Sequence, residues 1–385
     1  MNNFLKKTMV ILACVVVFAI LHVYATEPVD ELSDMCRVKE LHGITSSLIN
    51  ERRATNARSV DFRKMDYIHL HPYFEETMND ARFALLREFN EILRDAIIIQ
   101  NKVNGLNVTI GDVIIGFAEP DFILWDKFFI GLTNERYFEL IDLVKDFTGI
   151  EKEMLYITIW EPIVSWDPIS EYIEFDNFAG SDSQYIEPTA LSLLMGTRIK
   201  RRSPNSTNFQ PFGTLGHPRD SNGRLVFSTS HGGIPQYSTV YTMNGLYIGT
   251  VLRPVRLPSS GIDVSLIRLN QGIFISRMIP GTSQSINTFF ADSRQTNPSS
   301  VTMHGAVSGN VVGNILHHSI DLNFDSFLWR DMLVANIRGT QGDSGAALTS
   351  NGRVYGTAAF GSQSLEIGFF SRAINYQHIQ PWPWQ

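Results

Sequence analysis

Cysteine is nearly absent from this chain of 385 residues, which contains only Cys14 and Cys36. Cys14 lies in an apolar N-terminal segment that we expect to be removed, so the mature chain keeps one cysteine and has no internal disulfide. The scarcity excludes a small scaffold held together by disulfides. Stability must then come from packing, from a high unfolding barrier or from assistance during folding.

Metal-binding patterns are also scarce. His69 and His71 lie close together in an acidic, polar segment, but neither a cysteine pair nor a His-Glu-x-x-His motif accompanies them. Zinc sites normally show one of these patterns, so a metal pair at these histidines is the weaker alternative. We predict no metal and no cofactor. The chain also has no internal repeat and no low-complexity tract.

A membrane-spanning run is lacking as well. The apolar segment 9–23 follows Lys6 and Lys7 and is short for a span, with His22 near its end. The small residues at its end suit cleavage before Thr26, so we predict a signal peptide over residues 1–25, secretion and no stable membrane anchor. A retained anchor is the alternative. The sequons at Asn107 and Asn205 permit glycosylation of a secreted protein.

Charge is divided unevenly along the chain. Residues 26–190 contain 31 acidic and 15 basic residues, whereas residues 191–385 contain 8 acidic and 15 basic residues. The two parts therefore carry net charges of −16 and +7, and opposite charges predict two bodies that attract each other. We expect no nucleic-acid partner for this chain.

The two parts also differ in their expected secondary structure. Residues 26–190 read as mixed α/β, with helices at 75–99 and 133–149 and strands at 108–117 and 154–160. Thr133 is the expected cap and Gly149 the expected end of the second helix. The polar stretch 167–190 reads as an exposed linker. From residue 194 onward, short alternating runs between glycine- and proline-rich turns predict an all-β domain.

One turn of the β-rich part carries the strongest chemical signal. Gly342-Asp343-Ser344-Gly345 leads into an apolar strand and would expose the Ser344 hydroxyl on a tight turn. The backbone N–H groups of Gly342 and Ser344 could hold the oxyanion that forms when this hydroxyl attacks a carbonyl. An ordinary glycine-rich β-turn is the alternative reading.

A base and an orienting acid occur upstream in suitable settings. His231 follows the β-prone run 225–230 and precedes a glycine turn, and Asp263 opens an alternating strand. His231 would take the proton from Ser344, and Asp263 would fix the imidazole tautomer and stabilise its protonated form. His217 is the rival base, but Pro218 places it in a loop.

These motifs, in the order His, Asp, Ser, resemble those of the chymotrypsin-like serine proteases. The bacterial branch of α-lytic protease and the streptogrisins is the most similar, through Ile248-Gly249-Thr250-Val251, Val301-Thr302-Met303-His304-Gly305 and Gly356-Thr357-Ala358-Ala359-Phe360-Gly361. The resemblance covers about the last 190 residues. It implies two six-stranded antiparallel barrels, with His231 and Asp263 on the first and Ser344 on the second. It also implies, from layout alone, an α/β pro-region before the protease domain.

The resemblance further suggests residues that contact the substrate. Ala359, Phe360 and Gly361 replace the family's Ser-Trp-Gly and could pair with an extended peptide. Arg338 stands where relatives often place a residue at the floor of the specificity pocket. An arginine there would favour substrates with acidic side chains, by direct charge pairing. A rim position that faces solvent is the alternative. Asp343 needs a buried partner, but Met303 replaces the arginine of the bacterial branch.

Together these patterns predict a secreted serine endopeptidase made as a zymogen, with three segments: a signal peptide (1–25), an acidic pro-region with linker (26–190) and a protease domain (191–385). The pro-region would act as an intramolecular inhibitor and folding aid, and the substrates would be proteins or peptides. A cut just before Leu194 would release the protease, with Lys200-Arg201-Arg202 as the rival site. A catalytically inactive relative that binds peptides or polymers is the alternative.

Overall fold

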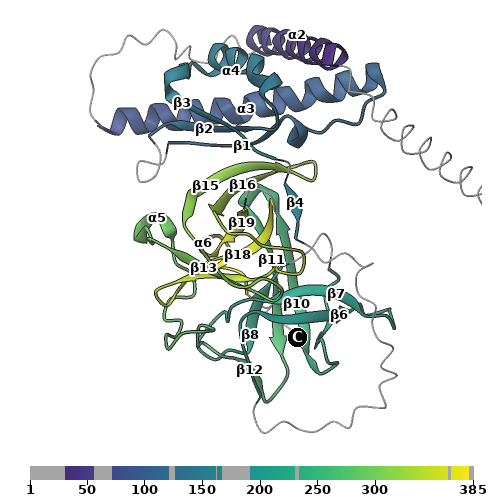
Figure 1. Ribbon diagram of the computed structural model, residues 1–385, viewed down its shortest axis with the longest axis vertical. Helices are drawn as coiled ribbons and strands as arrows, with labels where there is room; N and C mark the ends of the chain where they lie inside the picture. Colours follow the sequence, from purple (N-terminus) through teal and green to yellow (C-terminus); the bar gives the residue numbers. More distant parts are fainter. Residues whose placement is uncertain are drawn as a thin grey trace, which may run out of the picture.

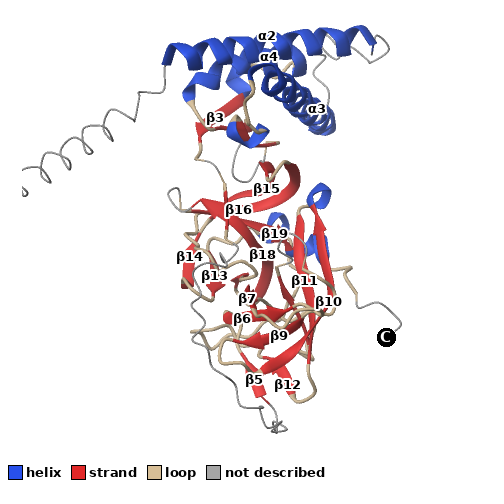
Figure 2. Cartoon of the chain, turned by 90° about the vertical axis from the view of Figure 1, so that its right-hand side faces the viewer, coloured by secondary structure: helices blue, strands red, loops and turns tan. Residues whose placement is uncertain are grey.

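The structure is a computed structural model, and it describes residues 31–55, 72–120, 126–161, 163–166, 191–229, 234–362 and 366–380. The signal segment, the His69–His71 pair and His231 lie outside these residues. The long helices gather at one end of the molecule together with a few strands, and most of the strands lie at the other end (Figures 1 and 2). Among the described residues, no helix is both long and apolar enough to span a membrane.

The N-terminal part consists of helices packed on a small sheet. Its main elements are α2 (Glu31–Thr55), α3 (Pro72–Asn104), β1 (Ile114–Ala118), β2 (Phe128–Leu132), α4 (Leu140–Thr148) and β3 (Leu155–Ile159), with short 3₁₀ turns η2 (Ile110–Asp112), η3 (Glu135–Glu139) and η4 (Lys152–Met154). In the sheet, β2 pairs antiparallel with β1 and parallel with β3. The apolar faces of the helices and the sheet share one core.

Two local expectations for this part were wrong in detail. The segment 108–117 is not one strand, because the Thr109 and Asp112 side chains form a capping box that starts the turn η2 before β1. Thr133 is not the helix cap; Asn134 accepts the hydrogen bond from the N–H of Arg136 instead. Gly149 does end α4, with the left-handed φ of 71° that favours glycine at this position.

The first half of the β-rich part is a nearly closed barrel. Its strands are β6 (Thr197–Arg202), β7 (Gln210–Leu215), β8 (Leu225–Ser228), β9 (Thr239–Thr242), β10 (Tyr247–Leu257) and β11 (Ile262–Leu269), in the order β7-β6-β9-β10-β11-β8. The N–H of Gly216 donates to the carbonyl of Phe227, and the N–H of Phe227 donates to that of His217. These bonds bring the two edge strands together. A short pair, β5 (Leu191–Leu193) with β12 (Ile273–Ile275), lies beside the barrel.

The second half is a larger antiparallel sheet. It contains β13 (Val301–Gly305), β14 (Gly309–Gly313), β15 (Ile315–Phe324), β16 (Phe327–Ala335), β17 (Ala347–Ser350), β18 (Arg353–Ser362) and β19 (Ile367–Arg372), with the short helices α5 (Ser293–Thr296) and α6 (Ala373–Tyr376). The fold class expected from the sequence is confirmed: a β-rich part with a nearly closed six-stranded antiparallel barrel follows a helical N-terminal region.

The sheet of the N-terminal part continues the sheet of the β-rich part. Strand β1 pairs antiparallel with β15, with Gly116 opposite Leu322. The rings of Phe129 and Trp160 from the N-terminal part pack in one cluster with Phe369 from β19. The two parts therefore share both backbone hydrogen bonds and an apolar core.

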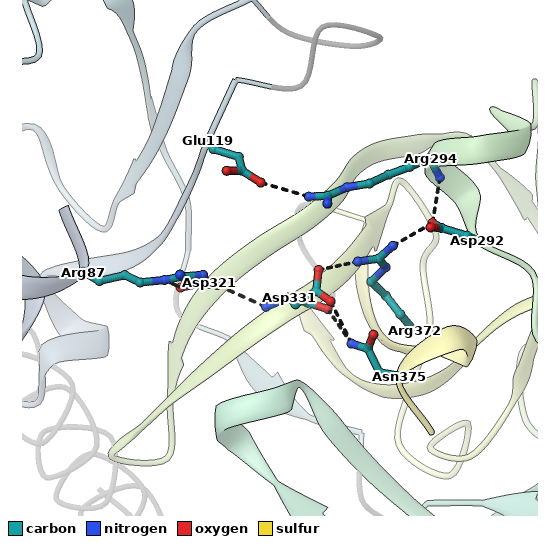
Figure 3. Close-up of polar contacts among 8 residues, drawn as sticks. All are labelled: Arg87, Glu119, Asp292, Arg294, Asp321, Asp331, Arg372 and Asn375. Carbon is teal, nitrogen blue, oxygen red and sulfur yellow. Dashed lines mark hydrogen bonds and ion pairs between the residues drawn. The ribbon is translucent and has the colours of Figure 1, made fainter. Parts of the chain in front are cut away.

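Polar contacts surround this junction (Figure 3). Arg87 on α3 donates to the buried carboxylate of Asp321 at 2.6 Å, and Arg294 donates to Glu119 at 3.1 Å. Next to them, Arg372 bridges Asp292 and Asp331 within the β-rich part. Of the two ion pairs that cross the junction, only Arg294–Glu119 follows the charge division along the sequence, because Arg87 supplies a cation from the acidic part to an anion of the basic part.

Candidate active site

Ser344 lies on a tight turn at the start of β17 and is fully buried. Gly342 and Gly345 flank the turn with φ values of +98° and +94°, which residues with a side chain rarely adopt. The N–H of Gly345 donates to the carbonyl of Ala358, and the Ser344 hydroxyl lies 3.4 Å from the carbonyl oxygen of Ala359. Glycine is thus needed on both sides to place the serine hydroxyl beside β18.

Thr214 from the first barrel anchors the same turn. Its hydroxyl donates to the carbonyl of Gly342 at 2.7 Å, and its N–H donates to the carbonyl of Ser344 at 2.9 Å. The hydroxyl also accepts from the N–H of Ala306 at 3.1 Å. The serine turn is therefore held across the boundary between the two halves of the β-rich part.

Asp343 points into a ring of donors rather than toward an arginine. Its carboxylate accepts from the N–H groups of Val307 at 2.8 Å, Ser308 at 3.1 Å and Thr340 at 2.9 Å, and from the Ser308 hydroxyl. These four donors offset the cost of burying the carboxylate. The expected buried cation is thus replaced here by a turn of the β13–β14 hairpin.

Asp263 lies near the start of β11 and is almost fully buried. Its N–H donates to the hydroxyl of Ser371 on β19 at 2.9 Å, which ties it to the second half. Its carboxylate lies 3.4 Å from the hydroxyl of Thr229, at the end of β8. The carboxylate therefore stands beside the segment that leads to His231.

The end of β8 also lies against the serine turn. A Cβ added at Gly345 would lie 2.6 Å from the Ser228 hydroxyl and 2.9 Å from the backbone nitrogen of Thr229. His231 follows Thr229 by two residues, which limits its distance from Thr229 to about 7 Å. The structure therefore brings both the Asp263 carboxylate and the Ser344 turn against Thr229. The position of His231 stays a prediction from the sequence.

A segment of the N-terminal part occupies the other side of the serine turn. Strand β4 (Val164–Ser165) pairs antiparallel with β18, with Ser165 opposite Phe360 and Val164 opposite Gly361. The N–H of Gly342 donates to the carbonyl of Trp166 at 2.7 Å. A peptide carbonyl therefore sits on one of the two N–H groups expected to hold the oxyanion.

The remaining candidates occupy contrasting places. Ala359, Phe360 and Gly361 lie on β18, where β4 pairs with the last two. Arg338 faces solvent, with 69% of its side chain exposed and Glu366 at 3.9 Å, as in the rim alternative. The rival base His217 is fully buried between the Pro218 carbonyl and the Tyr376 hydroxyl, and burial lowers its pKa to about 4.

Sequence reasoning missed Thr214 and Trp166. Thr214 ends an ordinary β-strand, so no local pattern singles it out. Trp166 directly precedes the polar stretch 167–190. An apolar residue just before a linker was the one signal in the sequence that could have indicated its role. Within the described residues no cluster of three metal-ligating side chains is found.

Comparisons with known proteins reveal similarity in structure rather than in sequence. No protein-family model matches the chain, and no curated protein is significantly similar to it. Solved structures similar to it include protease A of Thermobifida fusca (17% identity, TM-score 0.36) and a chymotrypsin of Cellulomonas bogoriensis (16%, 0.35), each over 47% of this chain and 92% of the other. A Nocardiopsis protease (16%, 0.33) matches over 47% and 93%. These neighbours are bacterial chymotrypsin-like serine proteases.

Proposed function

We propose that this chain is a secreted serine endopeptidase made as a zymogen. Ser344 is the nucleophile, His231 the general base and Asp263 the residue that orients the base. The observation that carries the proposal is the Trp166 carbonyl, which accepts a hydrogen bond from the N–H of Gly342, two residues before Ser344. A peptide carbonyl bound to an expected oxyanion donor supports a role in acyl transfer.

The reaction would proceed through an acyl-enzyme. The Ser344 hydroxyl attacks the substrate carbonyl while His231 accepts its proton, and the oxyanion is held by the N–H groups of Gly342 and Ser344. His231 then returns the proton to the leaving amine, and water hydrolyses the ester by the same steps in reverse order. Thr214 and Asp343 contribute by fixing the turn that carries these groups.

The N-terminal part would act as the inhibitor of the uncut chain. Strand β4 lies along Phe360 and Gly361, where an extended substrate would add a strand to β18. An incoming peptide therefore competes with a segment of the same chain. The pairing of β1 with β15 holds that segment in place and supports a role for the N-terminal part in folding the protease.

Secretion and glycosylation complete the proposal. The signal segment carries the expectation of export, and both sequon asparagines, Asn107 and Asn205, are exposed. Mass measurement of the exported chain with and without glycosidase treatment tests both sequons.

Replacing Ser344 tests the catalytic proposal directly. The full chain should process itself, cleave peptides and react with a phosphonylating reagent, whereas Ser344→Ala should lose all three, with cleavage falling by about 10⁶-fold. Ser293→Ala is the matched control, because that serine is equally buried but its hydroxyl has no partner among the described residues. A folded wild-type chain that never reacts at Ser344 would favour the inactive binding protein instead.

A further inference from the structure

The side chain of Trp166 fills a slot made by three glycines. A Cβ added at Gly339 would lie 2.5 Å from the indole, one at Gly361 2.2 Å and one at Gly368 2.7 Å. Contacts below about 3 Å are not tolerated between non-bonded heavy atoms, so any side chain at these positions would displace the indole. The three glycines lie before the serine turn, on β18 and on β19. The slot therefore exists because these residues lack side chains.

The slot has a fixed position relative to the proposed chemistry. The Trp166 carbonyl is the one bound by the N–H of Gly342, and the two preceding residues pair with β18. Trp166 is therefore the residue whose carbonyl Ser344 would attack. Its side chain marks the pocket that selects the residue before the cleaved bond.

The chemistry of the slot is apolar and aromatic. The ring of Phe370 meets the indole edge to face, at 6.4 Å between centroids and 81° between planes. The indole Nε1 is buried and has no hydrogen-bond partner among the residues that the structure describes. Burying an unpaired N–H is unfavourable, so the aromatic ring of the occupant stabilises binding in the slot and its nitrogen does not. Arg338 faces solvent, and its charge is not directed at the occupant.

We propose, on the basis of the proposed function, that this slot selects large aromatic residues and that the chain first cuts itself after Trp166. The Ser344 oxygen bonds to the Trp166 carbonyl carbon, and the bond to the nitrogen of Asp167 breaks as that nitrogen takes the proton held by His231. Water then releases the Trp166 carboxylate and restores the serine. Because Phe fills the slot without an unpaired N–H, peptides with Phe before the cut are cleaved at least as fast as those with Trp.

The alternative cuts fit the structure less well. A cut before Leu194 would detach β5, which pairs with β12 and buries Leu193 in the core of the first barrel. Lys200, Arg201 and Arg202 lie in β6, which pairs with β7 on one side and β9 on the other. Both alternative cuts would therefore break strand pairs of the folded chain, which disfavours them.

Gly339 offers a specific test of the slot. The three atoms nearest to a Cβ at this position all belong to the Trp166 indole, and its φ is not in the left-handed region. Gly339→Ala therefore shortens the slot without a backbone clash among those contacts. Gly43→Ala is the matched control, because a Cβ there meets nothing within 4 Å.

The experiment uses the full chain as wild type, Gly339→Ala, Gly43→Ala and the double variant Gly339→Ala/Trp166→Ala. Three quantities are measured: the N-terminus of the earliest fragment, the cleavage rates of peptides that differ only before the cut (Phe, Trp, Leu, Ala, Glu), and labelling of Ser344 by a small phosphonylating reagent. The wild type and Gly43→Ala should yield a fragment beginning at Asp167 and cleave after Phe and Trp fastest. Gly339→Ala should lose about a hundredfold for Phe and Trp, keep cleavage after Ala and keep labelling. The double variant should regain self-processing.

The readouts separate this inference from the proposed function. A chain that is labelled at Ser344 and cleaves peptides, but begins its earliest fragment elsewhere or prefers Glu, overturns the inference alone. Unchanged cleavage after Phe and Trp in Gly339→Ala does the same. A folded wild-type chain that is not labelled and cleaves nothing overturns both.

Discussion

Gly342 is held from two sides. Its N–H meets the Trp166 carbonyl, and its own carbonyl accepts from the Thr214 hydroxyl at 2.7 Å. A glycine with a φ of +98° is free to adopt other conformations, so an external hydrogen bond is the natural way to fix it. Under the proposed function, Thr214 is therefore a positioning residue, which would act on the oxyanion site through the backbone of Gly342.

Removing the Thr214 hydroxyl should lower turnover without changing substrate binding. Loss of a direct oxyanion donor costs about 10²- to 10³-fold in other proteases, and loss of its support should cost about tenfold in kcat. Thr214→Val should show this drop in kcat at constant KM, and Thr214→Ser should restore the rate. Thr349→Val is the control, because that buried hydroxyl contacts His304 instead. A change in KM alone would contradict the positioning role.

Burial of His217 should make the fold sensitive to acid. Its pKa is lowered from 6.5 to about 4, so the folded chain binds fewer protons than the unfolded chain between these values. Stability is therefore complete above pH 6.5 and falls as the pH drops toward 4, at up to about 1.36 kcal/mol per unit, or roughly 3 kcal/mol in all.

Denaturant unfolding of the uncut Ser344→Ala chain at pH 7, 5.5 and 4 measures this loss. His217→Gln in the same background removes the titrating group and should reduce the slope of unfolding free energy against pH. A residual slope is expected, since burial also lowers the pKa of His304 and His317. An unchanged slope in His217→Gln would show that His217 is not buried in its neutral form.

At the scale of elements, local patterns were the predictable part. The turn 342–345 and the end of α4 at Gly149 could be predicted because glycines with φ > 0 carry a local signal. Helix α2 was not foreseen: among its described side chains, 36–54, those buried are Val38, Leu41, Thr45 and Ile49, too sparse a pattern to stand out. The pairing of β4 with β18 joins segments far apart in sequence, and two residues of strand leave no pattern of their own.

The site shows the same limit. Ser344 and Asp263 stood in recognisable motifs, whereas the partners of Asp343 are mostly backbone N–H groups, which every residue carries. The slot around Trp166 is defined by absent side chains at Gly339, Gly361 and Gly368. Neither backbone donors nor absent side chains produce a distinctive sequence pattern, so both features could be identified only in the folded chain.

The junction of α3 with β15 gives a prediction at this scale. Asp321 is buried with 1% of its side chain exposed, and Arg87 donates two hydrogen bonds to it. Arg87→Ala leaves that carboxylate with the N–H of Asp331 as its remaining donor among the described residues, and should weaken the junction by about 2 kcal/mol, or roughly 30-fold. Hydrogen exchange of β1 and β15 amides in the uncut Ser344→Ala chain should accelerate accordingly.

Lys102→Ala is the matched control for this variant. Lys102 lies on the same helix as Arg87 and is exposed. Its replacement removes the same positive charge without touching β15. Equal acceleration in both variants would mean that net charge, rather than the Arg87–Asp321 pair, holds the junction.

At the scale of the whole molecule, the junction should open in acid. His317 on β15 lies against the ring of Phe129 at 4.5 Å and near Trp160 at 6.3 Å, both from the N-terminal part. Burial, and then the neighbouring His318, lower the pKa of His317 to about 3. Release of the N-terminal part removes the two covering rings, so the pKa should return toward 6.5.

Association is then complete above pH 6.5 and weakens as the pH falls below it, by up to about 1.36 kcal/mol per unit. Glu119 acts in the opposite direction, since burial raises its pKa and the associated state retains a proton there more readily. Its effect begins at its ordinary pKa of 4.5 and extends upward, so it offsets part of the His317 effect at the acidic end of the window. Comparison with a variant that lacks the His317 imidazole isolates the His317 contribution.

The measurement follows the cleaved but associated protein by size-exclusion chromatography at pH 7 and 5, at constant ionic strength because ion pairs cross the junction. The fraction of protease that elutes without its N-terminal part should rise at pH 5. His317→Phe keeps an apolar ring against Phe129 but cannot take a proton, and should stay associated at both values. Equal release from the wild type and His317→Phe would assign the pH dependence to another group and leave His317 as a packing residue.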